Sequence, residues 1–528
     1  MQLFENYVYS QLSVDSEGKL TQAANLDYDS KRIASYLANK QPKLYSCQAF
    51  DTKPVGENIK QAVQSMINQD PTQDAFMVYD NSRLDEIMKD WNQTIPWIEM
   101  RYAVKCNPLK CLLSDLNKKG AGFDIASQGE LERLVQLGVN PEKIIFSNPF
   151  KLETALDYAY KNGVRLTVAD TYGELEKIRR IAPEMKILWR ISVPEVKKGN
   201  GCVNFGEKFG DAMSSITEIQ QKFQKLFEQG YKISGIHFHA GSGHNGSEGF
   251  QEWLQVARQC ILIGKQIGHP MEILDIGGGF AANCINESFS TVLQYNEKDV
   301  LGCQYVAEPG RHIASRLFQL AVRVIGKRVV GNKMSIYVND GVYHAFNKVA
   351  TDHVSLNGQR LFFDENNVQN NNSNVISVKD KFLPENVEQE VEATIFGMTC
   401  DGLDVIASEV VIPKSIDIGD WLIFGGMGAY TYSMLSYFNS MNSCSKILVV
   451  ENEISTVPQQ MQEIGQSILL DGQVTALDNH GAMADLGLGL PIVQQFENLN
   501  LMENLQDNVF QDGTANFGSV LPDIVQVL

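Results

Sequence analysis

The segment RYAVKCNP (residues 101–108) places a lysine, Lys105, where a strand is expected to end. Tyr102 and Val104 are residue types that favour strands, and Pro108 cannot continue a β-ladder. Most lysines at a strand end extend their charged group into water. A lysine held in a pocket can instead act as a Schiff-base nucleophile, because the pKa of its amine changes readily on desolvation. The residues around Lys105 therefore decide its role.

Two further motifs would suit pyridoxal 5'-phosphate as the group that such a lysine carries. The segment DIGGGF (275–280) has three consecutive glycines, whose backbone N–H groups can approach a phosphate closely. The segment AEPGR (307–311) supplies Glu308 for the pyridine nitrogen and Arg311 for the phosphate. A carboxylate at the pyridine nitrogen keeps the ring protonated, so that it accepts electrons when a bond at Cα breaks. Each motif alone is also compatible with an ordinary turn.

The segment HFHAGSG (237–243) places His239 and Ser242 after another strand. We assign His239 to stacking on the cofactor ring and Ser242 to the phosphate, and we give His237 a structural role. The segment GFDIAS (122–127) adds Asp124. This carboxylate could serve the cofactor or only the N-terminus of the helix that follows.

The elements that must position these residues alternate between strand-like and helix-like patterns from about residue 97 to 311. Eight strands separated by helices predict an α/β fold with a (β/α)8 barrel, whose active site lies at the C-terminal ends of the strands. The eight expected strands are 98–105, 120–127, 143–149, 165–171, 186–193, 233–240, 271–279 and 303–310. Lys105, Asp124, Arg190, His239, Gly279 and Glu308 all fall at or just after such an end.

After about residue 320 the alternation of strand and helix patterns ends. Strand and turn patterns follow, and they predict a β-rich C-terminal domain. We expect five regions: an N-terminal extension (1–42), a segment that packs with the β-rich domain (43–75), the cofactor-binding barrel (76–320), the β-rich domain (321–451) and an acidic C-terminal extension (452–528).

Composition excludes several classes of protein. The net charge is -18, and no Lys or Arg follows Lys446 while eleven Asp and Glu do, so we expect no nucleic acid partner. The nine cysteines are scattered without a C-x-x-C pair, which predicts neither disulfides nor a metal site and favours the cytoplasm. Apolar runs stay shorter than the roughly 18 residues of a membrane span, so we expect no membrane association.

Nine motifs in order resemble the eukaryotic-type ornithine decarboxylases, which are pyridoxal-phosphate enzymes with an alanine-racemase-like barrel and a β domain. The motifs are YAVKCN, GFDIAS, SNP, HFHAGSG, DIGGGF, AEPGR, YVNDGVY, TCDGLD and MGAYT, and they span about residues 75 to 450. The resemblance implies decarboxylation of L-ornithine to putrescine, in polyamine biosynthesis, by a homodimer with shared active sites.

The resemblance also implies roles for single residues. Lys105 would hold the cofactor, His239 would stack on it and Glu308 would meet the pyridine nitrogen. Cys400 would reach across the dimer interface and return a proton to the substrate after carbon dioxide leaves. The remaining cofactor residues would be Asp124, Arg190, Ser242, Gly279, Gly310, Arg311 and Tyr430, and the substrate residues would be Asp352, Asp401 and Tyr343.

The sequence departs from the family pattern at Thr351, where an aromatic residue is usual, and in an Asn-rich loop at 364–374. Lysine is longer than ornithine by one methylene, which is worth only about 1–3 kcal/mol, so another basic amino acid stays open as substrate. Asp401 disfavours diaminopimelate, whose distal carboxylate it would repel. A third alternative is an inactive antizyme-inhibitor-like regulator, and an antizyme-like protein is a candidate partner in either case. The complete set of cofactor residues argues against the inactive form.

Overall fold

The computed structural model describes residues 42–47, 55–192, 208–242, 248–282, 285, 301–331, 333–352, 356–357, 359, 361, 389–441, 443–444 and 446–450. The Asn-rich loop and the expected acidic C-terminal extension lie outside the described residues, as does the expected N-terminal extension up to residue 41. Within the described residues, no helix combines the length and the apolar character needed to cross a membrane.

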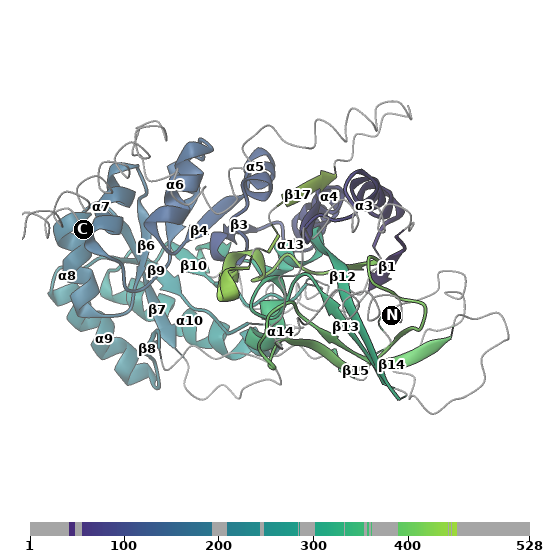
Figure 1. The fold of residues 1–528 in the computed structure, drawn as a ribbon. Coiled ribbons are helices and arrows are strands. Elements are labelled where there is room, and N and C mark those ends of the chain that lie inside the picture. The colour runs from purple at the N-terminus through teal and green to yellow at the C-terminus, as the bar shows by residue number, and fades with distance from the viewer. Residues whose placement is uncertain are drawn as a thin grey trace, which may run out of the picture. The chain divides into compact units, whose positions relative to one another are not determined.

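Eight parallel strands form a closed barrel (Figure 1), which confirms the predicted (β/α)8 fold. Their order around the barrel is β6-β5-β4-β3-β11-β10-β9-β7, and pairing of β6 with β7 closes it. The strands are β3 (Ile98–Ala103), β4 (Gly122–Ile125), β5 (Ile144–Phe146), β6 (Leu166–Ala169), β7 (Lys186–Ser192), β9 (Ile233–His237), β10 (Ile273–Asp275) and β11 (Gln304–Ala307). The short strand β8 (Asp211–Ala212) pairs with the end of β7.

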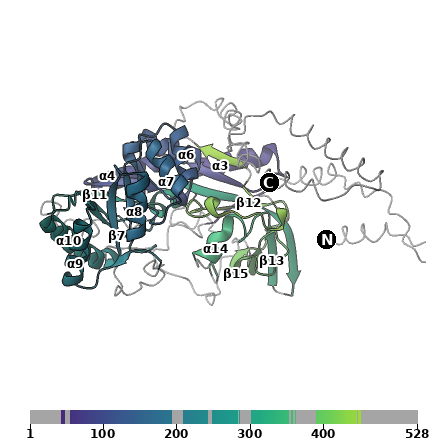
Figure 2. The same ribbon diagram turned by 90° about the vertical axis from the view of Figure 1, so that its left-hand side faces the viewer.

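Helices lie outside the barrel strands, as Figures 1 and 2 show for α7 to α10. Three of the barrel helices begin at a capping residue with a glutamate three positions later. Ser127, Thr171 and Ser215 each accept a hydrogen bond from the backbone N–H of that glutamate. The barrel helices are α5 (Lys110–Lys118), α6 (Gln128–Gln136), α7 (Glu153–Lys161), α8 (Tyr172–Ile181), α9 (Ile216–Glu228), α10 (Glu248–Ile267) and α13 (Arg311–Ala314).

A second sheet of eight strands forms the predicted β-rich domain, and it combines two strands that precede the barrel in the chain with six that follow it. Its strands are β1 (Leu44–Cys47), β2 (Phe76–Asp80), β12 (Phe318–Val330), β13 (Lys333–Val338), β14 (Glu390–Phe396), β15 (Val405–Pro413), β16 (Trp421–Phe424) and β17 (Lys446–Val450). Helix α3 (Glu57–Gln69) packs Ile59, Val63 and Ile67 into one apolar core with Phe76 and Trp421 of this sheet.

One expected boundary differs from the structure. Residues 76–80, which we placed at the start of the barrel, form β2, and β2 pairs with β12 and β17 of the second sheet. All five residues of β2 are buried, so the strand carries no alternating pattern that would indicate which sheet it joins. Helix α4 (Ser82–Thr94) then leads from β2 to β3, the first barrel strand.

The segment 427–433 of the β-rich domain docks on the turn that holds Lys105. The backbone N–H of Tyr430 donates to Cys106 O at 3.0 Å, and Asn107 Nδ2 donates to Gly428 O at 2.9 Å. A Cβ atom at Gly428 would overlap the carbonyl oxygen of Ala314, so only glycine fits this close approach. The two domains therefore meet at the ends of the barrel strands.

Candidate active site

Polar residues from neighbouring strands form a row at the C-terminal end of the barrel. Arg190 of β7 is the register partner of His237 of β9, and His237 is the register partner of Asp275 of β10. Side chains at register partners point to the same side of a sheet, so these three share the barrel interior. Glu308 follows β11, and its backbone N–H donates to Gly277 O at 2.8 Å.

Lys105 lies in a 3-10 turn (Val104–Cys106) that directly follows β3. Its Nζ is 2.5 Å from Asp124 Oδ2, and its side chain is 39% exposed while that of Asp124 is fully buried. Burial alone would lower the pKa of the Lys105 ammonium, but the Asp124 and Glu308 carboxylates outweigh burial and raise this pKa above its usual range. The Lys105 amine is thus held at the end of β3, and its side chain remains partly accessible from solvent.

A serine connects the two buried carboxylates. The Ser147 hydroxyl contacts Asp124 Oδ1 and lies 2.5 Å from Glu308 Oε1. Burial and the charge of Glu308 raise the pKa of Asp124. For Glu308, burial acts in the same direction, but His237, Lys105 and Ser147 outweigh it and hold the pKa well below its usual range. A hydroxyl has a single proton, so these directions favour donation from Ser147 to the ionised Glu308.

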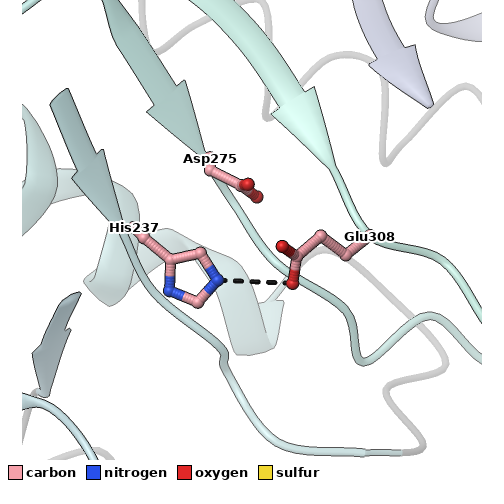
Figure 3. A group of neighbouring side chains, drawn as sticks. All are labelled: His237, Asp275 and Glu308. Carbon is pink, nitrogen blue, oxygen red and sulfur yellow. Dashed lines mark hydrogen bonds and ion pairs between the residues drawn. The ribbon is translucent and has the colours of Figure 1, made fainter. Parts of the chain in front are cut away.

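Figure 3 shows His237, Asp275 and Glu308 converging from the ends of three neighbouring strands. His237 Nε2 lies 3.3 Å from Glu308 Oε2, and Asp275 Oδ1 accepts the Gly277 N–H at 2.8 Å. Burial and the charge of Glu308 raise the pKa of Asp275 well above its usual range, which favours the neutral acid. Glu308 is therefore the ionised carboxylate of this group.

The ring of His239 lies against the backbone of the glycine turn at residues 277–279. Burial, together with the charges of Arg190 and Lys105, lowers the pKa of His239 well below its usual range, so the imidazole is neutral. His239 Nδ1 accepts the Gly241 N–H at 3.1 Å. A Cβ atom at Gly278 would come within 2.9 Å of His239 Nε2, so the backbone and the ring are in close contact.

Arg311, at the start of α13, joins several predicted phosphate ligands. Its guanidinium lies 5.1 Å from the ring centroid of Tyr430 and 3.5 Å from Ser242 Oγ. Arg311 also binds the Asp352 carboxylate through two hydrogen bonds of 2.7 and 3.1 Å. Gly310 packs against Cys106, and a Cβ atom at this position would come within 2.8 Å of the Cys106 Cβ. The Arg311 guanidinium, together with the hydroxyl groups beside it, can hold a phosphate.

Other predicted residues gather around the turn between β14 and β15. The Tyr343 hydroxyl donates to Asp401 Oδ2, and its ring lies 4.5 Å from that of Phe438. Cys400 is exposed, and its Sγ lies 3.5 Å from Asn439 Oδ1. The contacts of Cys400 and Asp401 are thus with this turn and the 436–439 segment, whereas the contacts of Asp352 are with Arg311.

The buried carboxylate of Asp404 fixes this turn. It accepts hydrogen bonds from the Val342 N–H at 2.8 Å, from the Thr399 N–H at 2.9 Å and from the Thr399 hydroxyl at 2.7 Å. Glycines at 341 and 397 pass so close to this carboxylate that neither position has room for a Cβ atom. Asp404 therefore connects the segment that carries Tyr343 to the turn that carries Cys400 and Asp401.

Four residues of the site have no chemical role among the sequence-based expectations: Ser147, His237, Asp275 and Asp404. For Ser147, a signal was present, because it directly follows a strand as Lys105 and Glu308 do. For His237, the signal was its place two residues before His239, on the same inward side. For Asp404, the signal was its place at the end of the motif TCDGLD, which also carries Cys400 and Asp401.

Known proteins resemble this chain over most of its length. Residues 81–315 match the family described as "Pyridoxal-dependent decarboxylase, pyridoxal binding domain". The chain is 34% identical over 373 residues to the chloroplastic ornithine decarboxylase of Nicotiana glauca, covering 70% of this chain and 82% of that protein. It is 30% identical over 447 residues to the ornithine decarboxylase of Rattus norvegicus, covering 80% of this chain and 90% of that protein.

A solved structure also resembles this one. The arginine decarboxylase of Paramecium bursaria Chlorella virus superposes with a TM-score of 0.64 at 29% sequence identity, covering 74% of this chain and 99% of that chain.

Proposed function

The chain belongs to the family of pyridoxal-dependent decarboxylases and is a pyridoxal-phosphate-dependent amino acid decarboxylase. From this premise we propose that its substrate is L-ornithine and its product is putrescine. The observation that carries the proposal is the continuous set of contacts from Lys105 through Asp124 and Ser147 to Glu308. These contacts place an amine and an ionised carboxylate in one site at the C-terminal ends of the barrel strands.

The residues present fit pyridoxal 5'-phosphate. Lys105 would hold it covalently, Glu308 would bind its pyridine nitrogen, and the neutral ring of His239 would pack on its face. Asp124 and Arg190 add charge inside the barrel, beside this site. The phosphate ligands would be Ser242, Gly279, Gly310, Arg311 and Tyr430. When bound, the cofactor withdraws electrons from the substrate Cα and so weakens the bond to the carboxylate.

The chain's own residues control the protons of this chemistry. Asp124 Oδ2 lies 2.5 Å from Lys105 Nζ, so it can take the proton that the ammonium must lose before the amine acts as a nucleophile. Glu308 stays ionised because of the charge and hydrogen bond of His237, the charge of Lys105 and the hydrogen bond from Ser147. A fixed negative charge at that position favours a protonated pyridine nitrogen.

The active form is a homodimer in which Cys400 of the partner subunit returns a proton to the substrate Cα. Two observations support this proposal. Cys400 lies on the surface of its own chain, and the neighbouring apolar side chains of Leu403 and Tyr437 are 76% and 66% exposed. Apolar groups with such exposure favour burial against a second protein surface.

The distal ammonium of ornithine meets Asp352 of one chain and Asp401 of the partner subunit, with Tyr343 orienting Asp401. A cation taken out of water needs a paired negative charge. Thr351, next to Asp352, is exposed and smaller than the aromatic residue usual in the family, which leaves lysine as the alternative substrate to test.

Carbon dioxide release from ornithine, lysine and arginine tests the substrate. Ornithine should give the highest kcat/KM. A higher value for lysine or arginine would reassign the substrate within the family, and no release by cofactor-loaded protein would favour an inactive antizyme-inhibitor-like regulator. Borohydride reduction should fix the cofactor on the peptide that contains Lys105, and a label on another lysine would contradict the site.

Mixing two inactive variants tests the shared site. Lys105→Ala and Cys400→Ala subunits should regain part of the activity when mixed, because some mixed dimers contain one intact site. Each variant mixed with itself is the control. Activity that stays absent after subunit exchange is demonstrated would place both residues in one chain and contradict the shared-site dimer.

We also propose a cytosolic location, which the seven free cysteines among the described residues support. An antizyme-like protein is the regulatory partner that the family resemblance suggests, and co-purification with such a protein would test it.

A further inference from the structure

His237 is a buried histidine that the proposed reaction does not use. It is the last residue of β9 and is 0% exposed. Its Nε2 lies 3.3 Å from Glu308 Oε2, while its Nδ1 has no hydrogen-bond partner among the described residues. A buried polar atom without a partner costs free energy, and such atoms in folded proteins call for an explanation.

The role of His237 follows from its other ring nitrogen, Nε2, and from what Glu308 must do. Its Oε1 is 2.5 Å from Ser147 Oγ, and its Oε2 faces His237. One donor on each oxygen fixes the plane of a carboxylate, and each oxygen still has a lone pair for a further donor. The third donor in the proposed site is the protonated pyridine nitrogen, so Glu308 must be aligned before that contact can form.

We propose that His237 is a positioning residue, which donates a hydrogen bond from Nε2 to Glu308 and so holds this carboxylate in the orientation that meets the cofactor ring nitrogen. This inference rests on the proposed cofactor site. Donation from Nε2 requires either the neutral tautomer with its proton on Nε2 or the imidazolium.

The electrostatics of the site agree with this geometry. Burial would raise the pKa of Glu308, and the charge and hydrogen bond of His237 are the largest effects that oppose it. Asp275, on the other side of the group, has its pKa raised by burial and by Glu308 and therefore adds no second negative charge. The other ionisable groups near Glu308 are Lys105, Asp124, Arg190 and His239.

Two substitutions at position 237 separate positioning from packing. His237→Leu has a similar volume but no donor, whereas His237→Gln keeps an amide N–H that can reach the same oxygen. The control is His269→Leu, because His269 is also buried and binds Ile233, the first residue of the same strand, at the opposite end from the site.

The readouts are the Kd of each apoenzyme for pyridoxal 5'-phosphate, the pH titration of the bound cofactor's visible absorbance, and kcat and KM for ornithine. A hydrogen bond to a charged group typically corresponds to about a 10- to 100-fold change in an equilibrium or rate. His237→Leu should therefore weaken cofactor binding and lower kcat by about tenfold or more, shift the absorbance titration, and change KM little, since His237 does not contact the substrate.

His237→Gln should recover most of the cofactor affinity and kcat, and His269→Leu should reduce thermal stability while leaving both near wild type. If His237→Leu does not fold, His237→Asn replaces it, because its shorter amide cannot reach Glu308 and the same losses are expected.

Wild-type affinity and kcat in His237→Leu would overturn the proposal, as would equal losses in the Gln and Leu variants. Activity of the wild-type protein on ornithine is a separate result and decides the proposed function alone.

Discussion

Removing the Asp352 carboxylate tests how the substrate's distal ammonium is recognised. The structure adds a complication to this test, because Asp352 binds Arg311 through two hydrogen bonds of 2.7 and 3.1 Å. Arg311 is a proposed phosphate ligand, so Asp352→Ala acts on two groups: the distal ammonium and the guanidinium. The experiment must separate these effects.

The free-energy cost of removing the Asp352 carboxylate depends on how far solvent reaches this side chain and its neighbour Arg311. Breaking a buried ion pair costs about 3–5 kcal/mol. The side chains of Arg311 and Asp352 are 19% and 21% exposed, so partial screening by solvent reduces the cost. For the loss of the carboxylate from the distal ammonium at this partly exposed position, we expect about 2–3 kcal/mol, which is about 30- to 160-fold in kcat/KM.

The assay compares ornithine with L-norvaline, which has a methyl group in place of the distal aminomethyl group. Asp352→Ala should lose about 30- to 160-fold in kcat/KM with ornithine and much less with norvaline. The cofactor Kd, measured on the same protein, reports any effect through Arg311. Equal losses with both substrates would refute recognition of the ammonium by Asp352 and leave it only the role of orienting Arg311.

Three further predictions concern other parts of the site and fold. Ser147→Ala removes the hydroxyl between Asp124 and Glu308 and should lower kcat by about tenfold or more, and an unchanged kcat would contradict the contact's importance. Gly428→Ala forces a Cβ atom against the Ala314 carbonyl oxygen and should lower the free energy of unfolding by about 3 kcal/mol in urea, whereas Gly129→Ala, in open space, should not. Burial and the charge of Arg316 lower the pKa of His312 to about 4, so protonation disfavours the folded state. The free energy of unfolding should be constant above about pH 6.5 and fall toward pH 4, and His312→Gln should remove this part of the pH dependence.

The barrel could be predicted from the sequence because each of its elements has a local signal. Buried strand segments alternate with amphipathic helices, and residues such as Ser127 and Thr171 with a glutamate three positions later mark where helices begin. The same pattern placed Lys105 and Glu308 at the ends of strands. In a closed parallel barrel all strand ends of one kind meet, so the chemistry of these residues could be related before any distance was known.

Tertiary structure decided which groups contact one another. Strand β2 is buried at every position, and its partners β12 and β17 come from the part of the chain that follows the barrel. Asp352 and Arg311 are 41 positions apart, and His237 and Glu308 are 71 apart, so their contacts depend on the register of the strands that carry them. Residue type and spacing thus determined which chemistry the chain can perform.

The packing of strand ends decided that Glu308 stays ionised while Asp275 is neutral, because burial and neighbouring charge act on a pKa only once the groups are brought together.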